Sequence, residues 1–538
     1  TPISSCFAMI QADIVGASES SLGSSGQSGS LPSHVDMSDQ LWSDILAEGT
    51  AEFLSSMEAL HPKLIRAVPA YAILFRLGGA LRKGSISKEL YAMSKETTKI
   101  DEFWSHSWHV EPWKKILCLL FLNNGIPATL FGTGASLLGC ALTLTDTLPQ
   151  MPFPVSLWGT IFGVLSYLVV LLFWHPRQEV FLDVGCIDQS SPQKKVEGVL
   201  SMGGILKHST SMLVLWDVSF VERLWCIFEL AGFLKSHATD DSTPVVIRPV
   251  LFGPCALAIF GFTCLVMFMM IFLFSLGLRA ALLPAVGGMF FFILYPAAAT
   301  FRHYFHSMDT LASQLRDFRI SESKCHCCSS GHADRKNPCD REIVCRCIRR
   351  WFVSEEAFED CVRAFIPLCF SKQLGRYGFP YWLLLVATAP MLWALLDLAV
   401  AHWLQQDQFW QFWLGAAGGW WLGAHPLAAA HFFWGAKMLR KPASNRCGDI
   451  LKNLLVIAQN LPVLMVTFGL NEIIILFQFP AYLTTIIASS IHISLAVLAW
   501  FPPNGWLRFG RDPKKPADPE PTSAPTLHSL HPHRGLSI

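Results

Sequence analysis

Charged residues are scarce in this sequence. Lys, Arg, Asp and Glu make up 15% of its 538 residues, and the formal net charge at pH 7 is +1. The chain also lacks the G-x-x-x-x-G-K-S/T phosphate loop, the H-E-x-x-H zinc motif and the G-x-S-x-G nucleophile turn, which excludes the enzymes that depend on them. No cluster of basic residues indicates nucleic-acid binding. Apolar residues dominate instead: 52% of the chain is hydrophobic, with 39 Phe and 19 Trp, which is typical of a multi-pass membrane protein.

The apolar residues gather in long runs that come in pairs. A run of about 20 apolar residues can cross a bilayer as a helix, and two such runs make a helical hairpin. We therefore predict a multi-pass α-helical membrane protein with about eight spans in four hairpins. The hairpins are predicted at residues 116–175, 250–301, 380–435 and 451–501.

The segments outside the hairpins differ in composition. The Ser/Gly-rich start and the basic, Pro-rich end of the sequence are predicted to be disordered. An amphipathic helix is expected to begin at Ser354, whose hydroxyl is placed to cap it. Glu355 and Glu356 follow in its first turn, where negative charge is favourable. These segments are a leader at 1–35, a cytosolic helical segment at 36–98, a Cys/His-rich segment with the amphipathic helix at 302–379, and a tail at 502–538.

The basic residues fall almost entirely on one side of the predicted spans. Of the 41 Lys and Arg residues, only Arg279 lies in one of the four short turns on the other side. Because basic loops stay on the cytoplasmic side, we expect both termini and the large loops to be cytosolic in an integral membrane protein. The sequence does not indicate which membrane this is.

A cytosolic α/β unit is predicted around the first hairpin. Short runs rich in β-formers predict parallel strands, and helices are expected at 193–206 and from Glu222 onward. The strands are predicted at 99–108, 179–184, 212–216 and 244–250. Ligands of such sheets bind at the carboxyl ends of the strands. Those ends carry polar residues here, among them Ser105, Asp183, Asp188 and Asp217.

Three stretches of this unit resemble TIR (Toll/interleukin-1 receptor-like) domains. DEFWSHSW is similar to the first-strand motif of that family, and FLDVGCIDQSSP to its second strand and following loop. SMLVLWDVSFVERLWCIFELAGF resembles its third strand and its W-x-x-x-E helix, here Trp225 to Glu229. The resemblance implies a flavodoxin-like α/β unit built from residues 99–115 and 176–250 and interrupted by the first hairpin.

Members of the TIR family are either scaffolds that self-associate or enzymes that cleave the nicotinamide–ribose bond of NAD. The resemblance implies that Glu229 is the catalytic residue. A fixed carboxylate near the ribose stabilises the positive charge that develops as a glycosidic bond breaks. The residues expected to bind NAD are Ser105, Asp183, Asp188, Trp216 and Trp225.

The cysteines suggest a metal site. Most of the 16 cysteines are cytosolic on the predicted topology, where thiols stay reduced and clusters favour metal binding. A structural zinc site is predicted from Cys325, Cys328, His332 and Cys339, with Cys345 and Cys347 as alternative ligands. The alternative is a set of free surface thiols.

Ionisable residues within the predicted spans leave a second function open. They are Asp397, His425, His431 and His492. Such residues indicate either an ion or proton pathway or polar contacts between helices. The predicted function is a membrane-anchored signalling protein that presents its TIR-like unit to the cytosol and cleaves NAD. The alternatives are a transporter or channel with a regulatory α/β unit, and a non-enzymatic scaffold; the expected partners are the lipid bilayer and a second copy of the TIR-like unit.

Overall fold

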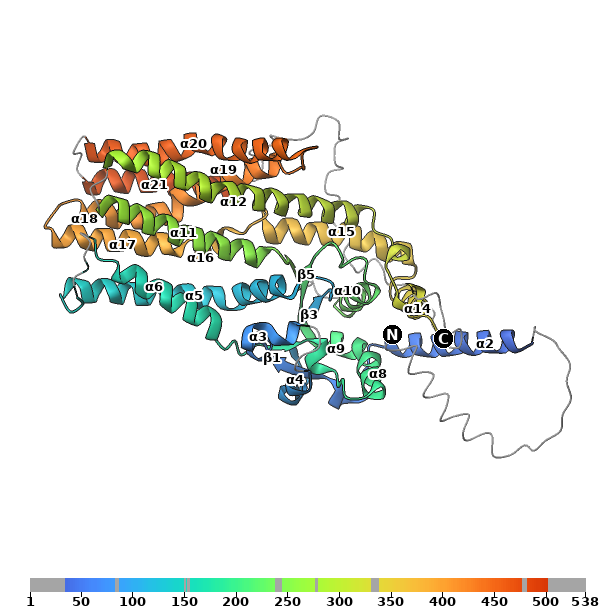
Figure 1. Ribbon diagram of the computed structural model, residues 1–538. Helices are drawn as coiled ribbons and strands as arrows, with labels where there is room; N and C mark the ends of the chain where they lie inside the picture. The colour runs from blue at the N-terminus through green and yellow to red at the C-terminus, as the bar shows by residue number, and fades with distance from the viewer. Residues whose placement is uncertain are drawn as a thin grey trace, which may run out of the picture.

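The chain forms a bundle of long helices joined at one end to a six-stranded sheet (Figure 1). The computed structural model describes residues 34–82, 87–149, 151, 155–237, 244–275, 279–329, 338–476 and 481–501. Figure 1 shows the apolar helices side by side on the left, and the sheet with its own helices on the right. The predicted leader up to residue 33 and the predicted tail from residue 502 lie outside the described residues.

The sheet is mixed, and its strand order is β2-β1-β4-β3-β5-β6. β3 pairs in parallel with β4 and β5, and β5 in parallel with β6. β1 runs antiparallel to both β4 and β2. The strands are β1 Arg66–Pro69, β2 Lys95–Glu96, β3 Ile100–His106, β4 Glu179–Phe181, β5 Ser209–Trp216 and β6 Val245–Pro249.

The four predicted strands are confirmed as β3 to β6. The segment 36–98 is predicted to be helical, and the structure differs in part, because the segment also supplies β1 and β2. With four and two residues, these strands are too short for an alternating pattern to reveal them. No further parallel strand follows β6 in the described part of the chain.

The first parallel strand lies inside the sheet, between the second and the third. Strand order therefore reverses at β3, and a reversal of this kind opens a crevice at the carboxyl ends of parallel strands. The connection from β3 to β4 contains α5 Pro112–Leu144 and α6 Trp158–Phe173. The predicted interruption of the α/β unit by the first helical hairpin is confirmed.

The sheet end contains the three helices that the sequence predicts individually, and the one expected from Glu222 onward is α10 Leu224–Ser236. The predicted helix at 193–206 is divided at Ser201 into α8 and α9. The Ser354 hydroxyl accepts a hydrogen bond from the Ala357 N–H at 3.1 Å, which confirms the predicted cap of α15. The helices are α2 His34–Ser55, η2 Pro62–Leu64, α3 Ala70–Gly78, η3 Gly79–Leu81, α4 Ser87–Met93, α7 Asp183–Cys186, α8 Pro192–Leu200, α9 Met202–Lys207, α10 Leu224–Ser236, η4 Ile320–Glu322, α13 His326–Ser329, α14 Asp340–Phe352 and α15 Glu355–Leu374.

The bundle end is made of apolar helices. Besides α5 and α6 they are α11 Phe252–Ser275, α12 Arg279–Arg316, α16 Tyr381–Ala387, α17 Ala389–Leu404, α18 Trp410–Gly419, the π-helix η5 Trp420–Ala424, α19 His425–Met438, α20 Arg446–Leu476 and α21 Ala481–Trp500. Among the described residues three helical stretches are long and apolar enough to cross a membrane, namely Pro112–Leu144, Phe252–Phe272 and Tyr482–Trp500. This fits an integral membrane protein.

The described residues do not show all of the eight predicted spans. A fourth span is obtained if α16 and α17, which meet at 53°, are counted together. The helix is interrupted there because Pro390, in the first turn of α17, has no N–H to continue the preceding helix. α6 is apolar but has 16 residues. The count of spans beyond four, and the predicted orientation, stay predictions.

Asp397 on α17 closes the amino end of α6. Its Oδ1 accepts the Gly159 N–H at 3.0 Å, and its Oδ2 accepts the Thr160 N–H and hydroxyl, each at 2.7 Å. The first N–H groups of a helix have no partner within it, and a buried carboxylate satisfies them. His431 makes a similar link, since its Nε2 lies 3.0 Å from the Gln459 carbonyl oxygen on α20. Two of the four ionisable residues thus hold helices together.

Orientation can be tested by glycosylation. The sequence contains no Asn-x-Ser/Thr acceptor, and Thr145→Asn creates one in the turn between α5 and α6. Because this turn is predicted on the far side of the membrane, we expect Thr145→Asn to gain one glycan during translation into microsomes. Cys447→Ser creates the matched acceptor in the predicted cytosolic loop and should gain none. A glycan on the Cys447→Ser chain with none on the Thr145→Asn chain would show that the orientation is reversed.

Loss of the α6 cap should destabilise the bundle. Asp397→Ala leaves two buried N–H groups without a partner, and we expect it to cost roughly 1–2 kcal/mol, the usual effect of removing a cap. Asp397→Asn keeps one oxygen acceptor, so its thermal midpoint in detergent should lie between those of Asp397→Ala and the unmodified chain. Asp360→Asn, at an exposed position on α15, is the control. Equal midpoints for Asp397→Ala and Asp360→Asn would contradict the capping role.

Candidate functional site

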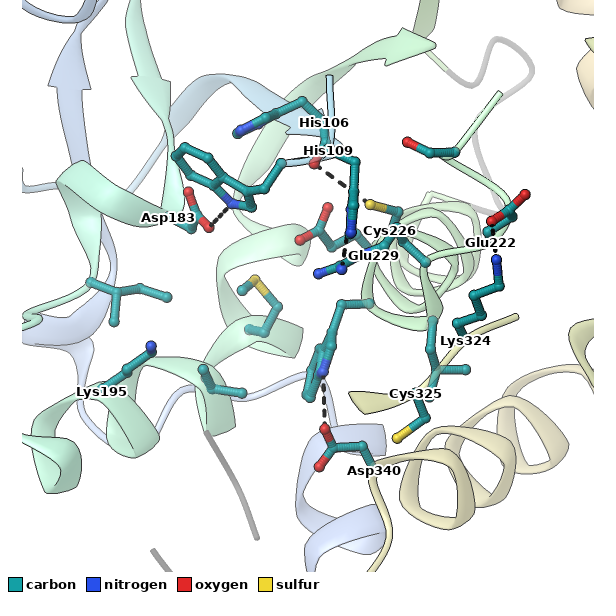
Figure 2. A pocket seen from close by; sticks show the side chains of 18 of the residues that line it. His106, His109, Asp183, Lys195, Glu222, Cys226, Glu229, Lys324, Cys325 and Asp340 are labelled. Carbon is teal, nitrogen blue, oxygen red and sulfur yellow. Dashed lines mark hydrogen bonds and ion pairs between the residues drawn. The ribbon is translucent and has the colours of Figure 1, made fainter. Parts of the chain in front are cut away.

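A cavity of about 930 Å³ opens at the carboxyl ends of the parallel strands. Figure 2 shows Glu229 near its centre, with Asp183 and Lys195 on one side and Lys324, Cys325 and Asp340 on the other. The walls come from the loop after β3, from α7 and α8, from α10, and from Lys324, Cys325 and Asp340. The size is at the upper end of the range for small-molecule sites.

Glu229 is held in the cavity by β3. It lies on α10 one turn after Trp225, as the W-x-x-x-E spacing predicts. The buried Ser105 hydroxyl, at the end of β3, donates to Glu229 Oε2 at 2.6 Å. Burial raises the pKa of Glu229 to about 8, and the nearby Asp183 carboxylate adds to the increase, whereas the Ser105 hydrogen bond opposes it. A carboxyl group that titrates near neutral pH in a cavity is typical of functional sites.

Asp183 is the second carboxyl group of the cavity. It begins α7, directly after β4, and its Oδ1 accepts the N–H of Val184 at 2.7 Å. The Trp108 indole donates to its Oδ2 at 3.1 Å. Burial raises the pKa of Asp183 as well. Two carboxyl groups therefore line one cavity. Glu229 is fixed by Ser105 at the end of β3, and Asp183 is fixed by Trp108 in the loop that follows β3.

Cationic and aromatic side chains complete the lining. The cations are Lys195 on α8, Arg223 before α10, and Lys324. Arg223 Nη1 lies 3.4 Å from His109 Nδ1, and Lys324 forms an ion pair of 2.6 Å with Glu222. The aromatic rings are those of Trp108 and Trp225. The cavity can thus receive a ligand that carries both negative charge and flat rings.

The structure brings four of the six predicted active-site residues together. Glu229, Asp183 and Trp225 line the cavity, and Ser105 reaches it through its bond to Glu229. Asp188 lies outside the lining and forms an ion pair of 3.0 Å with Lys194. Trp216 is fully buried and stacks on Phe220 at 4.8 Å between ring centroids, so it belongs to the core.

Several lining residues were not identified from the sequence. His109 follows the end of β3 closely, and its place after a strand was a usable signal, whereas Lys195 lies further along the chain on α8. Lys324 and Asp340 had no such signal, because they come from a segment about a hundred residues after α10. Asp340 Oδ2 nevertheless lies 3.4 Å from the Trp225 indole nitrogen, which donates to it.

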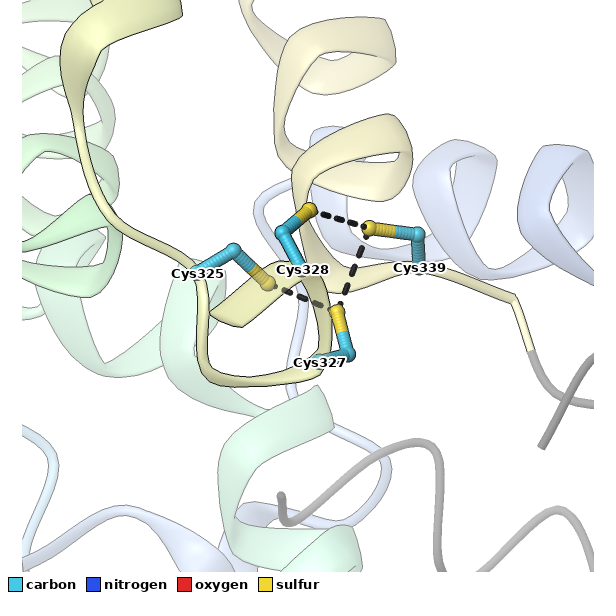
Figure 3. Close-up of side chains that lie close together, drawn as sticks. All are labelled: Cys325, Cys327, Cys328 and Cys339. Carbon is cyan, nitrogen blue, oxygen red and sulfur yellow. Dashed lines mark hydrogen bonds between the residues drawn. The ribbon is translucent and has the colours of Figure 1, made fainter. Parts of the chain in front are cut away.

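A cysteine cluster lies beside the cavity (Figure 3). The sulfur atoms of Cys325, Cys327, Cys328 and Cys339 all lie within 4.8 Å of one another and can hold a metal ion. Three of the four predicted ligands are therefore together, and Cys327 joins them. The fourth predicted ligand, His332, lies outside the described residues.

The two alternative zinc ligands are not part of the cluster. Cys345 and Cys347 lie on α14 and are buried in the core. The Cys347 thiol points toward α2, where it donates to the Ala51 carbonyl oxygen at 3.5 Å. The spacing of two positions in the sequence does not show where either thiol points. On a helix it places the two side chains on different sides.

Comparisons of the chain with models of protein families, with curated proteins and with solved structures find no match. The TIR resemblance therefore stays a prediction that rests on the motifs.

The stability of the fold should decrease as the pH rises, because Glu229 then loses its proton. Its pKa of about 8 in the folded state lies above the ordinary value of 4.5, so folding favours the protonated form. The free energy of unfolding should then decrease as the pH rises from about 4.5 to about 8 and change no further above that. Glu229→Gln imitates the protonated form, so it should match the unmodified chain at pH 5 and be more stable at pH 9.

The measurement is the thermal midpoint in detergent across this pH range. Glu52→Gln, at an exposed position on α2, serves as the control and should follow the unmodified chain. If the curves of Glu229→Gln and the unmodified chain run parallel, Glu229 does not titrate in this range.

Proposed function

We propose that the chain is a membrane-anchored signalling protein whose flavodoxin-like, TIR-like unit faces the cytosol and hydrolyses NAD at the nicotinamide–ribose bond. The observation that supports this best is the position of Glu229, a carboxyl group fixed by Ser105 in a cavity at the carboxyl ends of parallel strands. This is the location in which ligands of doubly wound sheets bind.

The chemistry follows from the charge of the reacting group. Cleavage of the nicotinamide–ribose bond passes through a sugar ring with oxocarbenium character, and neutral nicotinamide leaves. The Glu229 carboxylate would stabilise the positive ring, because it is held in place before the reaction and is partly shielded from water. Water then supplies the oxygen atom that replaces nicotinamide, and releases a proton.

The remaining lining suits the other parts of NAD. Lys195, Arg223 and Lys324 offer positive charge for the two phosphates. Trp108 and Trp225 offer ring faces for a base. Asp183 can accept a hydrogen bond from a ribose hydroxyl.

The fold supports the same proposal. β4, β3, β5 and β6 have the order 2-1-3-4 when they are numbered along the chain, which is the flavodoxin-like order without its fifth strand. The scaffold alternative would keep this fold and use its surfaces for self-association. The transporter alternative gains no support from Asp397, whose oxygens both bind the first turn of α6.

Turnover of NAD by the purified chain in detergent is the direct test. We expect release of nicotinamide, and we expect Glu229→Ala to lower kcat at least 100-fold, on the order of the loss seen when one fixed electrostatic group is removed. Glu52→Gln should keep the full rate. If the unmodified chain releases no nicotinamide, or Glu229→Ala releases it at the same rate, the enzymatic proposal is wrong.

The pH profile adds an independent readout. Because only the ionised carboxylate stabilises a cation, kcat/KM should rise with pH and level off above a midpoint near 8. A profile that is flat between pH 6 and 9 would contradict the assigned role of Glu229.

A further inference from the structure

We infer that Cys325, Cys327, Cys328 and Cys339 bind one Zn²⁺ as four thiolates, and that this ion holds one wall of the Glu229 cavity in place. The metal site does not depend on the proposed NAD chemistry. Its link to the cavity deepens that proposal, because it names what keeps the wall fixed.

The sulfur positions suit a tetrahedral ion. The sulfur atoms of Cys325 and Cys327 are 2.7 Å apart, those of Cys327 and Cys339 are 3.2 Å apart, and those of Cys328 and Cys339 are 3.4 Å apart. All four sulfur atoms lie within 4.8 Å of one another. The three individual distances are shorter than the edge of about 3.8 Å of a tetrahedron with Zn–S bonds of about 2.3 Å, and the limit of 4.8 Å is longer than that edge. Figure 3 shows the four side chains converging from the 325–328 turn and from the start of α14.

Metal binding requires that the cysteines lose their protons. The thiolate, and not the thiol, is the ligand of Zn²⁺. Binding of Zn²⁺ would release the thiol protons to water and leave an ion with four sulfur ligands.

Four protein ligands make this a structural site. A tetrahedral ion that is fully bound by cysteine has no open position for water or substrate. The ion therefore affects the cavity only through the segments that it joins. No reaction takes place at the metal.

Those segments belong to the cavity wall. Residues 223 and 324 form a parallel bridge, and the Ser323 hydroxyl donates to the Val221 carbonyl oxygen at 2.8 Å. The turn that carries Cys325 is thus bound to the residues directly before α10, the helix that carries Glu229. From the other side, Arg341 Nη1 donates to the Ser321 carbonyl oxygen at 2.6 Å.

The first and last ligands also stand next to lining residues. Cys325 lines the cavity, and Asp340, which follows Cys339, accepts the hydrogen bond of the Trp225 indole. Figure 2 shows Lys324, Cys325 and Asp340 on the same side of Glu229. An ion that joins Cys325 to Cys339 would therefore fix the distance between Lys324 and Asp340, which accepts the hydrogen bond of Trp225.

The first test is the zinc content of the full chain, purified in detergent without a metal-affinity step and dialysed against metal-free buffer. We expect about one zinc per chain, because four cysteines complete one tetrahedral site. Cys327→Ser and Cys339→Ser should each lose most of it. Cys447→Ser, at an exposed cysteine outside the cluster, should keep it.

His332→Ala separates the two possible ligand sets. Four thiolates need no imidazole, so this variant should keep its zinc. Loss of zinc from His332→Ala, with retention in Cys327→Ser, would overturn the inference in favour of Cys325, Cys328, His332 and Cys339. Absence of zinc from the unmodified chain, with all four thiols free to react, would overturn it altogether.

The second test uses the unmodified chain, so that failure of a variant to fold cannot mislead. A zinc chelator should increase amide hydrogen exchange in residues 321–329 and also in residues 221–229, while β3 keeps its protection. Faster exchange near the cysteines alone would refute the link to the cavity. Because neither measurement involves NAD, a chain that binds zinc as expected but releases no nicotinamide would disprove only the proposed enzymatic function.

Discussion

The parallel pairing of β3 with β5 is the constraint on which the rest of the structure depends. Ser105 lies opposite Val214 in this pairing, and both are buried. The register decides that the end of β3 meets the helix that follows β5, and the bond from Ser105 to Glu229 is the direct result. A shift by one residue would turn Ser105 to the other face of the sheet and remove the bond.

The same pairing ties the cavity to the apolar helices of the bundle. β3 ends at His106 and α5 begins at Pro112, while β6 ends at Pro249 and α11 begins at Phe252. Lys115, in the first turn of α5, donates to the Ser107 carbonyl oxygen at 3.2 Å and lies 4.9 Å from the centre of the Trp108 ring. Trp108 in turn donates to Asp183. The edge of the sheet that carries the cavity is thus the edge from which the chain enters the bundle.

Two stretches far along the chain, residues 320–329 and 338–341, supply what the α/β unit lacks. The unit has no further parallel strand after β6 among the described residues, and the residues around Lys324 and Asp340 cover the open side of α10 instead. These short stretches contain only η4, α13 and the start of α14, so contacts with the rest of the unit stabilise them. The ion pair of Lys324 with Glu222 is a contact of this kind, and the hydrogen bonds of Arg341 and the cysteine cluster join the two stretches to each other.

The sequence by itself determined the apolar character of the chain, the four parallel strands, the insertion of a hairpin between the first two, and the Trp225–Glu229 pair. These features are local, since each depends on hydrophobic period or on spacing within one element. Tertiary structure decided the rest. It placed Trp216 in the core, joined Cys327 to the cluster, turned Cys347 toward α2, and made Asp397 the cap of α6. It also brought Lys324 and Asp340 to the cavity. The physical reason is that these positions depend on contacts between residues far apart in the chain, and neither composition nor periodicity contains the register and packing that create such contacts.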